Sequence, residues 1–333
     1  MIINTSAYSR AGLIGNPSDG YYGKTISIIV KNYRADITLY ETPELTIVPN
    51  QRDKSIFPGL HELIEDVRLS GYYGGMRLIK AAIKRFGDYC EENNIELGKK
   101  NFTIRYNTNI PRQVGLAGSS AIIAATIRAL MKFYNIEIPK VILPNLILST
   151  ETDELGITAG LQDRVIQTYE GVVYMDFSED LIKRQGYGYY ESLDPALLPP
   201  LFIAYRTTLS EISGITHSNI KDRFDRGDKK VQDAMKYFAS LTEEAKECIQ
   251  SKNHKRLGEL IDENFDKRAE FWPISSQNRQ LIQTARDCGA SAKFTGSGGS
   301  IIGIYKDEAM YGKLAEEFDK IDTVIFKPII IGD

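Results

Sequence analysis

The chain has 333 residues, of which 42% are hydrophobic and 26% charged, and its formal net charge is −3. This composition is that of a globular protein with a buried core, and the charge gives no general attraction to nucleic acid or to an anionic membrane. Its three cysteines lack the paired spacing of a disulfide framework or a zinc site. The N-terminus lacks a signal-peptide pattern, and no apolar stretch reaches the roughly 18 residues of a membrane span. We therefore expect a cytoplasmic protein of two domains, with a small-molecule site in the cleft that they share.

The first predicted elements are strands and helices in the N-terminal part of the chain. A turn rich in Gly, Asn, Pro and Asp separates segments rich in β-branched and apolar residues, which predicts strands at 25–30 and 35–40. Apolar residues at spacings of three and four predict an amphipathic helix over 73–93. Alternation of apolar and polar residues predicts a strand at 102–106. The nearly all-apolar segment 121–134 predicts a helix that is buried on most faces.

A proline-rich break divides the later elements. Residues 171–177 and 201–205 predict strands, and prolines interrupt regular structure between them. We place the domain boundary there, so that the domains are 1–195 and 196–333. Beyond the boundary the pattern predicts three helices and a second glycine-rich loop that leads into a strand, at 229–251, 255–271, 278–288 and 293–304.

The segment between the strand at 102–106 and the buried helix is rich in glycine and serine. It reads Pro111-Arg112-Gln113-Val114-Gly115-Leu116-Ala117-Gly118-Ser119-Ser120-Ala121. Glycines let a backbone approach phosphate oxygens, and a helix N-terminus presents N–H groups without intrahelical acceptors. One of the two serines can cap the helix, and the other can bind a magnesium ion. The segment is not a Walker A motif, and taken alone it is equally compatible with a plain turn followed by N-capping serines.

Three motifs in register resemble those of the GHMP kinases, the superfamily of galactokinase, homoserine kinase, mevalonate kinase and phosphomevalonate kinase. The pattern Pro-x-x-x-Gly-Leu-x-x-Ser-Ser from Pro111 resembles their second motif, which implies that ATP binds at Pro111, Gly115, Leu116, Ala117, Gly118, Ser119, Ser120 and Ala121. Residues 7–19 are similar to their N-terminal substrate motif, and residues 293–299 to their C-terminal glycine motif. Within the superfamily the chain most resembles the glucuronokinases. It does so over 13–19, 109–115, 159–164 and 293–299.

The resemblance implies an α+β fold of two domains, each with its own architecture. The domain over 1–195 would be similar to ribosomal protein S5 domain 2, and the domain over 196–333 would be ferredoxin-like. The predicted elements agree with this fold but do not select it by themselves.

The resemblance also implies the catalytic residues. Glu151 falls where many GHMP kinases place a magnesium-binding Glu, and Asp163 falls where they place the catalytic Asp. Ser120 and Glu151 would bind Mg²⁺. Asp163 would orient or accept the proton of the sugar hydroxyl, and Arg10 would stabilise the ionised Asp163 and the charge on the anomeric oxygen. By spacing alone, neither carboxylate stands out among the 44 acidic residues.

A sugar acid is the substrate that the resemblance implies. Asp19 falls where galactokinases use an Asp to bind sugar hydroxyls, whereas Asn16-Pro17 replaces their Glu-His and argues against galactose. Arginine is well suited to bind the carboxylate of a uronate, because its planar guanidinium can donate two parallel hydrogen bonds. The predicted substrate-binding residues are Asn16, Asp19, Arg112, Arg164, Arg206, Gly296, Gly298 and Gly299. Lys293 is either a surface lysine or a phosphate contact, and the three histidines show no ligand spacing.

The sequence thus predicts an ATP- and Mg²⁺-dependent kinase that phosphorylates the anomeric hydroxyl of D-glucuronate. Two alternatives stay open: a GHMP kinase for a galactose-like sugar or a heptose, and a non-catalytic sensor that binds ATP and a sugar. The presence of Arg10, Ser120, Glu151 and Asp163 together favours the enzyme, because a sensor does not need the complete set. We expect a monomer or a homodimer.

Overall fold

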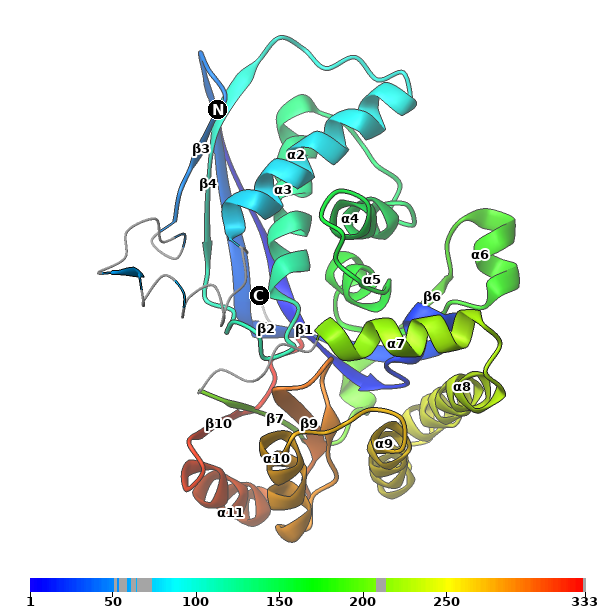
Figure 1. Cartoon of the computed structure of the whole chain (residues 1–333). Coiled ribbons are helices and arrows are strands. Elements are labelled where there is room, and N and C mark those ends of the chain that lie inside the picture. Colours follow the sequence, from blue (N-terminus) through cyan, green and yellow to red (C-terminus); the bar gives the residue numbers. More distant parts are fainter. Residues whose placement is uncertain (51–52, 54–58, 61–63, 65–73, 208–213, 332–333) are drawn as a thin grey trace. The chain divides into compact units, whose positions relative to one another are not determined.

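The computed structural model describes the whole chain except residues 51–52, 54–58, 61–63, 65–73, 208–213 and 332–333 (Figure 1). The described chain forms two compact units, and neither is one continuous run of residues. The first unit comprises Met1–Ser9, Tyr33–Ile110 and Ala117–Thr168, and the second comprises Arg10–Asn32, Pro111–Leu116 and Tyr169–Asp333. The predicted boundary between residues 195 and 196 stays a prediction. It lies between the last strand of the first sheet and the first strand of the second.

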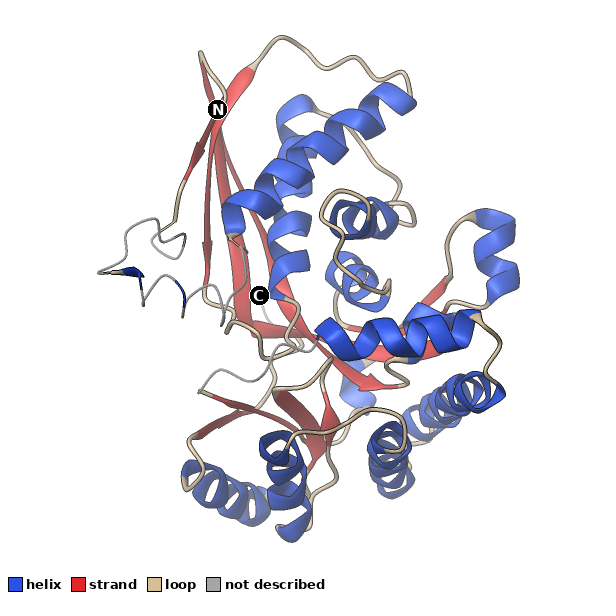
Figure 2. Cartoon of the chain, viewed as in Figure 1, coloured by secondary structure: helices blue, strands red, loops and turns tan. Residues whose placement is uncertain are grey.

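In the first unit, a sheet carries a layer of helices on one side (Figure 2). Strand β2 (Lys24–Thr42) pairs with β4 (Asn101–Thr108) in antiparallel fashion, and β3 (Thr46–Val48) adds to β4 in parallel. The sequence predicts two separate strands, at 25–30 and 35–40, whereas β2 runs through both segments without a break. One long strand can contribute to both units. The first half of β2 pairs within the second unit. Strand β1 (Ile2–Ile14) pairs with β2 and likewise passes through both units.

The helices of the first unit follow the apolar pattern of the sequence. Helix α2 (Gly75–Glu92) packs on α3 (Gly118–Tyr134) and α4 (Leu143–Thr152), and α5 (Gln162–Tyr169) follows. The prediction of a helix buried on most faces is confirmed for α3, which begins three residues earlier than expected because Ala117, with φ 59°, is its N-cap. This start places the two serines of the glycine-rich loop in the first turn of a buried helix.

The second unit holds the remaining strands of the first sheet and a sheet of its own. Strand β5 (Val172–Asp176) pairs with β2, and β6 (Tyr189–Leu193) pairs with β5. The second sheet has the order β10-β7-β9-β8 and is antiparallel throughout. Its strands are β7 (Leu201–Arg206), β8 (Lys293–Phe294), β9 (Ser300–Ile304) and β10 (Thr323–Phe326).

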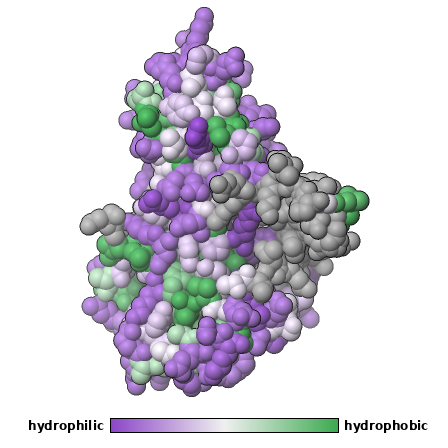
Figure 3. All heavy atoms as spheres, turned by 90° about the vertical axis from the view of Figure 1, so that its left-hand side faces the viewer, coloured by the Kyte–Doolittle hydropathy of each residue, from purple (hydrophilic) through white to green (hydrophobic). Residues whose placement is uncertain are grey.

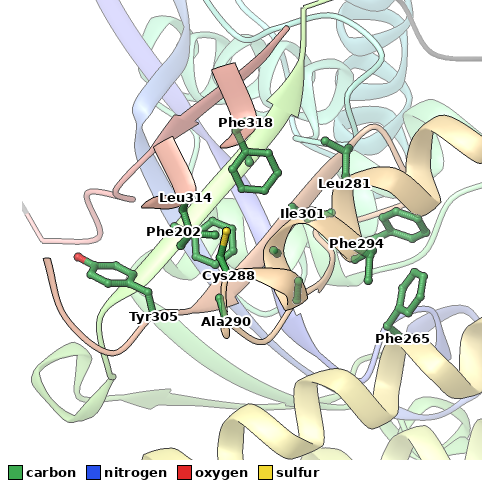
Figure 4. Packing of buried hydrophobic residues seen from close by; sticks show 14 residues of the cluster. Phe202, Phe265, Leu281, Cys288, Ala290, Phe294, Ile301, Tyr305, Leu314 and Phe318 are labelled. Atoms are coloured by element: carbon green, nitrogen blue, oxygen red, sulfur yellow. The ribbon is translucent and has the colours of Figure 1, made fainter. Parts of the chain in front are cut away.

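The α-helices of the second unit all follow β5 in the chain. They are α6 (Glu179–Gln185), α7 (Gly214–Asp225), α8 (Lys229–Gln250), α9 (His254–Ala269), α10 (Ser276–Asp287) and α11 (Glu308–Asp319). The main apolar cluster joins the sheet to α9, α10 and α11, and Phe202, Phe294 and Phe318 are among its largest side chains (Figure 4). The predicted helices α8, α9 and α10 are confirmed, and Gly289, with φ 89°, ends α10 as expected.

The surface is consistent with the composition. On the face shown in Figure 3, apolar residues lie in separate patches among hydrophilic ones. Among the helices that the structure describes, none has both the length and the apolar character needed to cross a membrane.

Candidate active site

The glycine-rich loop leaves the N–H groups of the first turn of α3 available to a ligand. Its backbone enters the left-handed region at Gln113, Gly115 and Ala117, with φ of 56°, 74° and 59°. In the described part of the chain, no hydrogen bond has the N–H of Gly118 or Ser119 as its donor. These donors lie at the positive end of the helix dipole, where an anion is stabilised. The loop therefore has the features of a phosphate site.

The two serines of the loop differ in exposure. Ser119 is exposed, whereas Ser120 is buried and its hydroxyl donates to Ala117 O at 3.2 Å. Because this bond uses the hydroxyl hydrogen, the oxygen lone pairs of Ser120 point elsewhere and suit a cation. The chemistry of Ser120 thus fits the predicted role of magnesium ligand.

A buried guanidinium joins both predicted catalytic carboxylates in the first unit. Arg164, in the first turn of α5, donates from Nε to Glu151 Oε2 at 2.8 Å, and its Nη2 donates to the same oxygen. Its Nη1 donates to Gly160 O at 2.8 Å and lies 3.4 Å from Asp163 Oδ2. The side chain of Asp163 is 17% exposed and that of Glu151 only 3%. Asp163 is therefore the carboxylate that solvent, or a substrate, can reach.

This pairing bears on the predicted role of Arg164 as a uronate ligand. Glu151 and Gly160 accept from all three of its nitrogens, which favours a role in fixing Glu151. The sequence could not reveal that Arg164 pairs with Glu151, because charged residues that lie twelve or thirteen positions apart are common. Among the described residues, no cluster of three or more His, Cys, Asp or Glu side chains could hold a metal. A magnesium ion that relies on substrate phosphates needs only one or two protein ligands.

In the second unit, Arg10 joins parts of all three sequence motifs. Its Nη1 donates to Gly115 O at 2.7 Å and to Thr295 O at 3.1 Å. The Thr295 hydroxyl also donates to Gly115 O, at 3.1 Å. A Cβ on Gly115 would lie 2.7 Å from Gly298 O, and one on Gly296 would lie 2.8 Å from Gly115 O. Close backbone approach thus explains why both loops contain glycine at these positions.

Lys293 is not the surface lysine that was one of the two roles suggested by the sequence. Its ammonium is buried and donates to Gly12 O at 2.7 Å, to Phe294 O at 2.8 Å and to Asn16 Oδ1. Burial lowers its pKa well below the ordinary value, and the positive charges of Arg268 and Arg10 lower it further. The surface reading of Lys293 is wrong, because this lysine anchors the substrate motif to β8. The predicted ligand Asn16 is itself buried and holds this anchor.

Arg268 is a residue that the sequence reasoning missed. It lies on α9, and its Nη1 and Nη2 donate to Gly296 O at 2.7 Å and to Ser297 O at 2.9 Å. Burial lowers the pKa of Arg268 to about 10. The charges of Tyr21 and Asp19 act in the opposite direction and raise this pKa, so the predicted sugar ligand Asp19 interacts electrostatically with Arg268. Helical periodicity could have found this arginine. It continues the buried face that Leu260, Ile261 and Asn264 define.

The other two predicted arginines lie in different surroundings. Arg112 is exposed in the glycine-rich loop. Arg206 lies at the end of β7, where its N–H donates to Gly299 O at 3.4 Å and its Nη2 donates to Gln280 Oε1. Its Nε is buried and has no acceptor in the described structure. Of the two, Arg206 is the one that contacts the third motif.

Comparison with known proteins places the chain in a family. Residues 77–171 match the model of the GHMP kinases N-terminal domain, and residues 245–320 match that of the GHMP kinases C-terminal domain. The chain is 42% identical to Glucuronokinase 1 of Arabidopsis thaliana over 99% of its own length and 92% of that protein. It is also 42% identical to Probable glucuronokinase 2 of the same plant, over 97% and 90% of the two chains.

A solved structure shares the fold at much lower identity. The Lactococcus lactis galactokinase, complexed with galactose, superposes with a TM-score of 0.77 and 16% identity over 99% of this chain and 93% of that one. The chain belongs to the GHMP kinase family. The predicted family and its two-domain fold of mixed helices and sheets are confirmed, and so is the resemblance to glucuronokinases.

Proposed function

We propose that the chain is an ATP-dependent sugar-acid 1-kinase, which transfers the γ-phosphoryl group to the anomeric hydroxyl of D-glucuronate. The observation that carries this proposal is the 42% identity to Glucuronokinase 1 over 99% of the chain. The site chemistry supports it, because free N–H groups at a helix start, an accessible carboxylate and buried cations are the parts that phosphoryl transfer requires. The proposed acceptor distinguishes this kinase from relatives that act on neutral hexoses.

In the proposed mechanism, the N–H groups at the start of α3 bind ATP phosphates, and Gly115 lets the backbone approach them. Asp163 accepts or orients the proton of the anomeric hydroxyl. Arg10, which its two carbonyl acceptors hold in a fixed position, stabilises negative charge that develops on the acceptor oxygen. Ser120 and Glu151 would hold Mg²⁺, which would neutralise phosphate charge when bound.

We infer the cellular compartment and the kind of substrate from the composition and from the state of the cysteines. Cys90, Cys248 and Cys288 are free and buried, as expected of a protein in the reducing cytoplasm. The net charge of −3 favours small-molecule substrates over nucleic acid or membrane. A monomer and a homodimer are both compatible with the proposal.

An ADP-release assay over a panel of sugars tests the substrate. We expect kcat/KM for D-glucuronate to exceed that for glucose and galactose by about a hundredfold, or about 2.7 kcal/mol, because a site that pairs a buried charge rejects analogues without it. Equal rates on galactose and glucuronate would exclude the uronate assignment. If the chain binds both ATP and a sugar but releases no ADP, the result would instead favour the non-catalytic sensor.

A further inference from the structure

Gln167 is a buried polar residue that the proposed mechanism does not use. It lies on α5, one helical turn after Asp163, and its side chain has no exposed surface. Its Nε2 donates to Ala117 O at 3.0 Å and to Tyr8 O at 3.2 Å. Ala117 is the N-cap of α3, and Tyr8 belongs to β1. One amide group thus ties α5 both to the start of α3 and to β1.

The two carbonyls determine the orientation of the Gln167 amide. Both are acceptors, so only the NH₂ end of the amide can face them, and it provides one N–H group for each. The Oε1 atom points elsewhere, and it is buried without a donor among the residues that the structure describes. A buried acceptor without a donor costs free energy, which an apolar side chain of similar size would avoid. Packing alone therefore does not explain a glutamine at this position.

The backbone of Gln167 is held as well. Arg128 of α3 donates from Nη2 to Gln167 O, and its Nη1 donates to Ser6 O at 2.7 Å. Helix α3 is therefore joined to α5 at two levels, at its N-cap and again further along the helix. A single contact would let one helix pivot on the other, whereas two contacts at different levels oppose this rotation.

The N-cap carbonyl of α3 is the point where these contacts meet the candidate active site. Ala117 O also accepts from the Ser120 hydroxyl at 3.2 Å. The turn that follows Ala117 carries the N–H groups that we propose as phosphate donors. The hydrogen bond from Gln167 to Ala117 O therefore links the helix that carries Asp163 directly to the turn that would hold the phosphates.

The geometry points to Gln167 as a positioning residue, which aligns the Asp163 carboxylate with the phosphate-binding turn of α3. The inference rests on the proposed function. Phosphoryl transfer depends on in-line placement of the acceptor oxygen, and a misplacement of about 1 Å can lower the rate about a hundredfold. The two hydrogen bonds of the Gln167 amide restrict such a misplacement.

The first experiment compares Gln167→Met with Thr126→Val. Methionine has a similar size but no donor, and the control removes a buried hydroxyl of α3 that donates within its own helix, to Ile122 O at 2.8 Å. At a temperature well below both Tm values, we expect kcat for glucuronate to fall at least about tenfold in Gln167→Met and less than about twofold in Thr126→Val. The KM values for ATP and glucuronate should change little in either variant, because the groups that bind them remain. Equal kcat values in the two variants, or a loss confined to KM, would overturn the inference and leave the proposed function intact.

A second pair of variants covers the case in which Gln167→Met fails to fold. Gln167→His keeps a nitrogen donor that is as many bonds from Cα as that of glutamine, whereas Gln167→Asn keeps an amide that is too short to reach either carbonyl. We expect kcat of Gln167→His to exceed that of Gln167→Asn at least about fivefold, because the place of the donor sets the alignment. Equal values or the reverse order would contradict the proposal.

The wild type separates this inference from the proposed function. A wild type that phosphorylates no sugar would disprove the proposed function, and with it the role of Gln167 in the reaction. If the wild type prefers a sugar other than glucuronate, the same loss of kcat in Gln167→Met is expected with that sugar. The reason is that the alignment of Asp163 does not depend on a carboxylate of the acceptor.

Discussion

Asp163 and Glu151 show how one arginine can give two carboxylates different surroundings. Glu151 receives two donors of Arg164 in a buried pair, while Asp163 lies 3.4 Å from a third nitrogen and stays partly exposed. A general base must reach the proton that it accepts, and this condition favours Asp163. Glu151 is buried and paired with Arg164, so its carboxylate is suited to keep one fixed position.

Asp163→Asn is therefore expected to lower kcat by at least about a hundredfold, because an amide cannot accept the proton of the sugar hydroxyl. The substitution conserves shape at a partly exposed position, so Tm and ATP affinity should change little. Steady-state kinetics, thermal unfolding and ATP binding calorimetry check the three expectations. Turnover close to that of the wild type would remove Asp163 from the mechanism.

At the scale of elements, α3 and α4 each contribute one proposed magnesium ligand. Ser120 lies in the first turn of α3, where the loop backbone fixes its hydroxyl, and Glu151 lies in the last turn of α4. Helix ends suit such ligands, because a rigid element positions a side chain more closely than a loop does.

Ser120→Ala and Glu151→Gln are each expected to raise the Mg²⁺ concentration at half-saturation and to lower kcat, since each weakens an oxygen ligand. Glu154→Gln is the matched control for the second variant, because Glu154 also loses an ion pair, with Lys84, just beyond α4. Kinetic titration with Mg²⁺ measures the effect. An unchanged half-saturation point in both variants would place the metal ligands elsewhere in the chain.

For the molecule as a whole, long-range polar contacts hold the substrate motif to the second sheet. Lys293 of β8 binds Gly12 O, a carbonyl 281 residues away, and Asn264 of α9 donates from Nδ2 to Asn16 O at 3.1 Å. Three oxygen acceptors surround the amino nitrogen of Lys293. The structure thus uses a buried lysine as an anchor, and the lowered pKa of this lysine makes the stability depend on pH.

The folded-state pKa of Lys293 is lowered, while its value in the unfolded chain is about 10.4. Between these values the unfolded state binds more protons, so Lys293 makes the wild type more stable as pH rises toward about 10. We expect the free energy of unfolding of the wild type, relative to Lys293→Met, to increase with pH by up to about 1.4 kcal/mol per unit. Urea unfolding at pH 7, 8 and 9 measures this difference. A difference that stays constant over this range would contradict the lowered pKa.

Strong local patterns allowed several elements to be predicted closely. The apolar periodicity of α8 and α9 and the strand alternation of β4 gave their places to within a few residues. Weaker patterns did not: the sequence predicts no helix or strand between the strands at 171–177 and 201–205, where the structure has α6 and β6. Short elements carry too few residues for periodicity to identify them.

The sequence by itself determined the family, and it indicated the candidate phosphate loop and the candidate site residues, because motifs and periodicity are local properties of the chain. Only the tertiary structure decided which charges meet. It paired Arg164 with Glu151, buried Lys293 beneath the substrate motif and placed Arg268 behind the turn at Gly296. The physical reason is that burial and long-range contact set the cost of a charge and the direction of its donors, and neither quantity is written in sequence spacing.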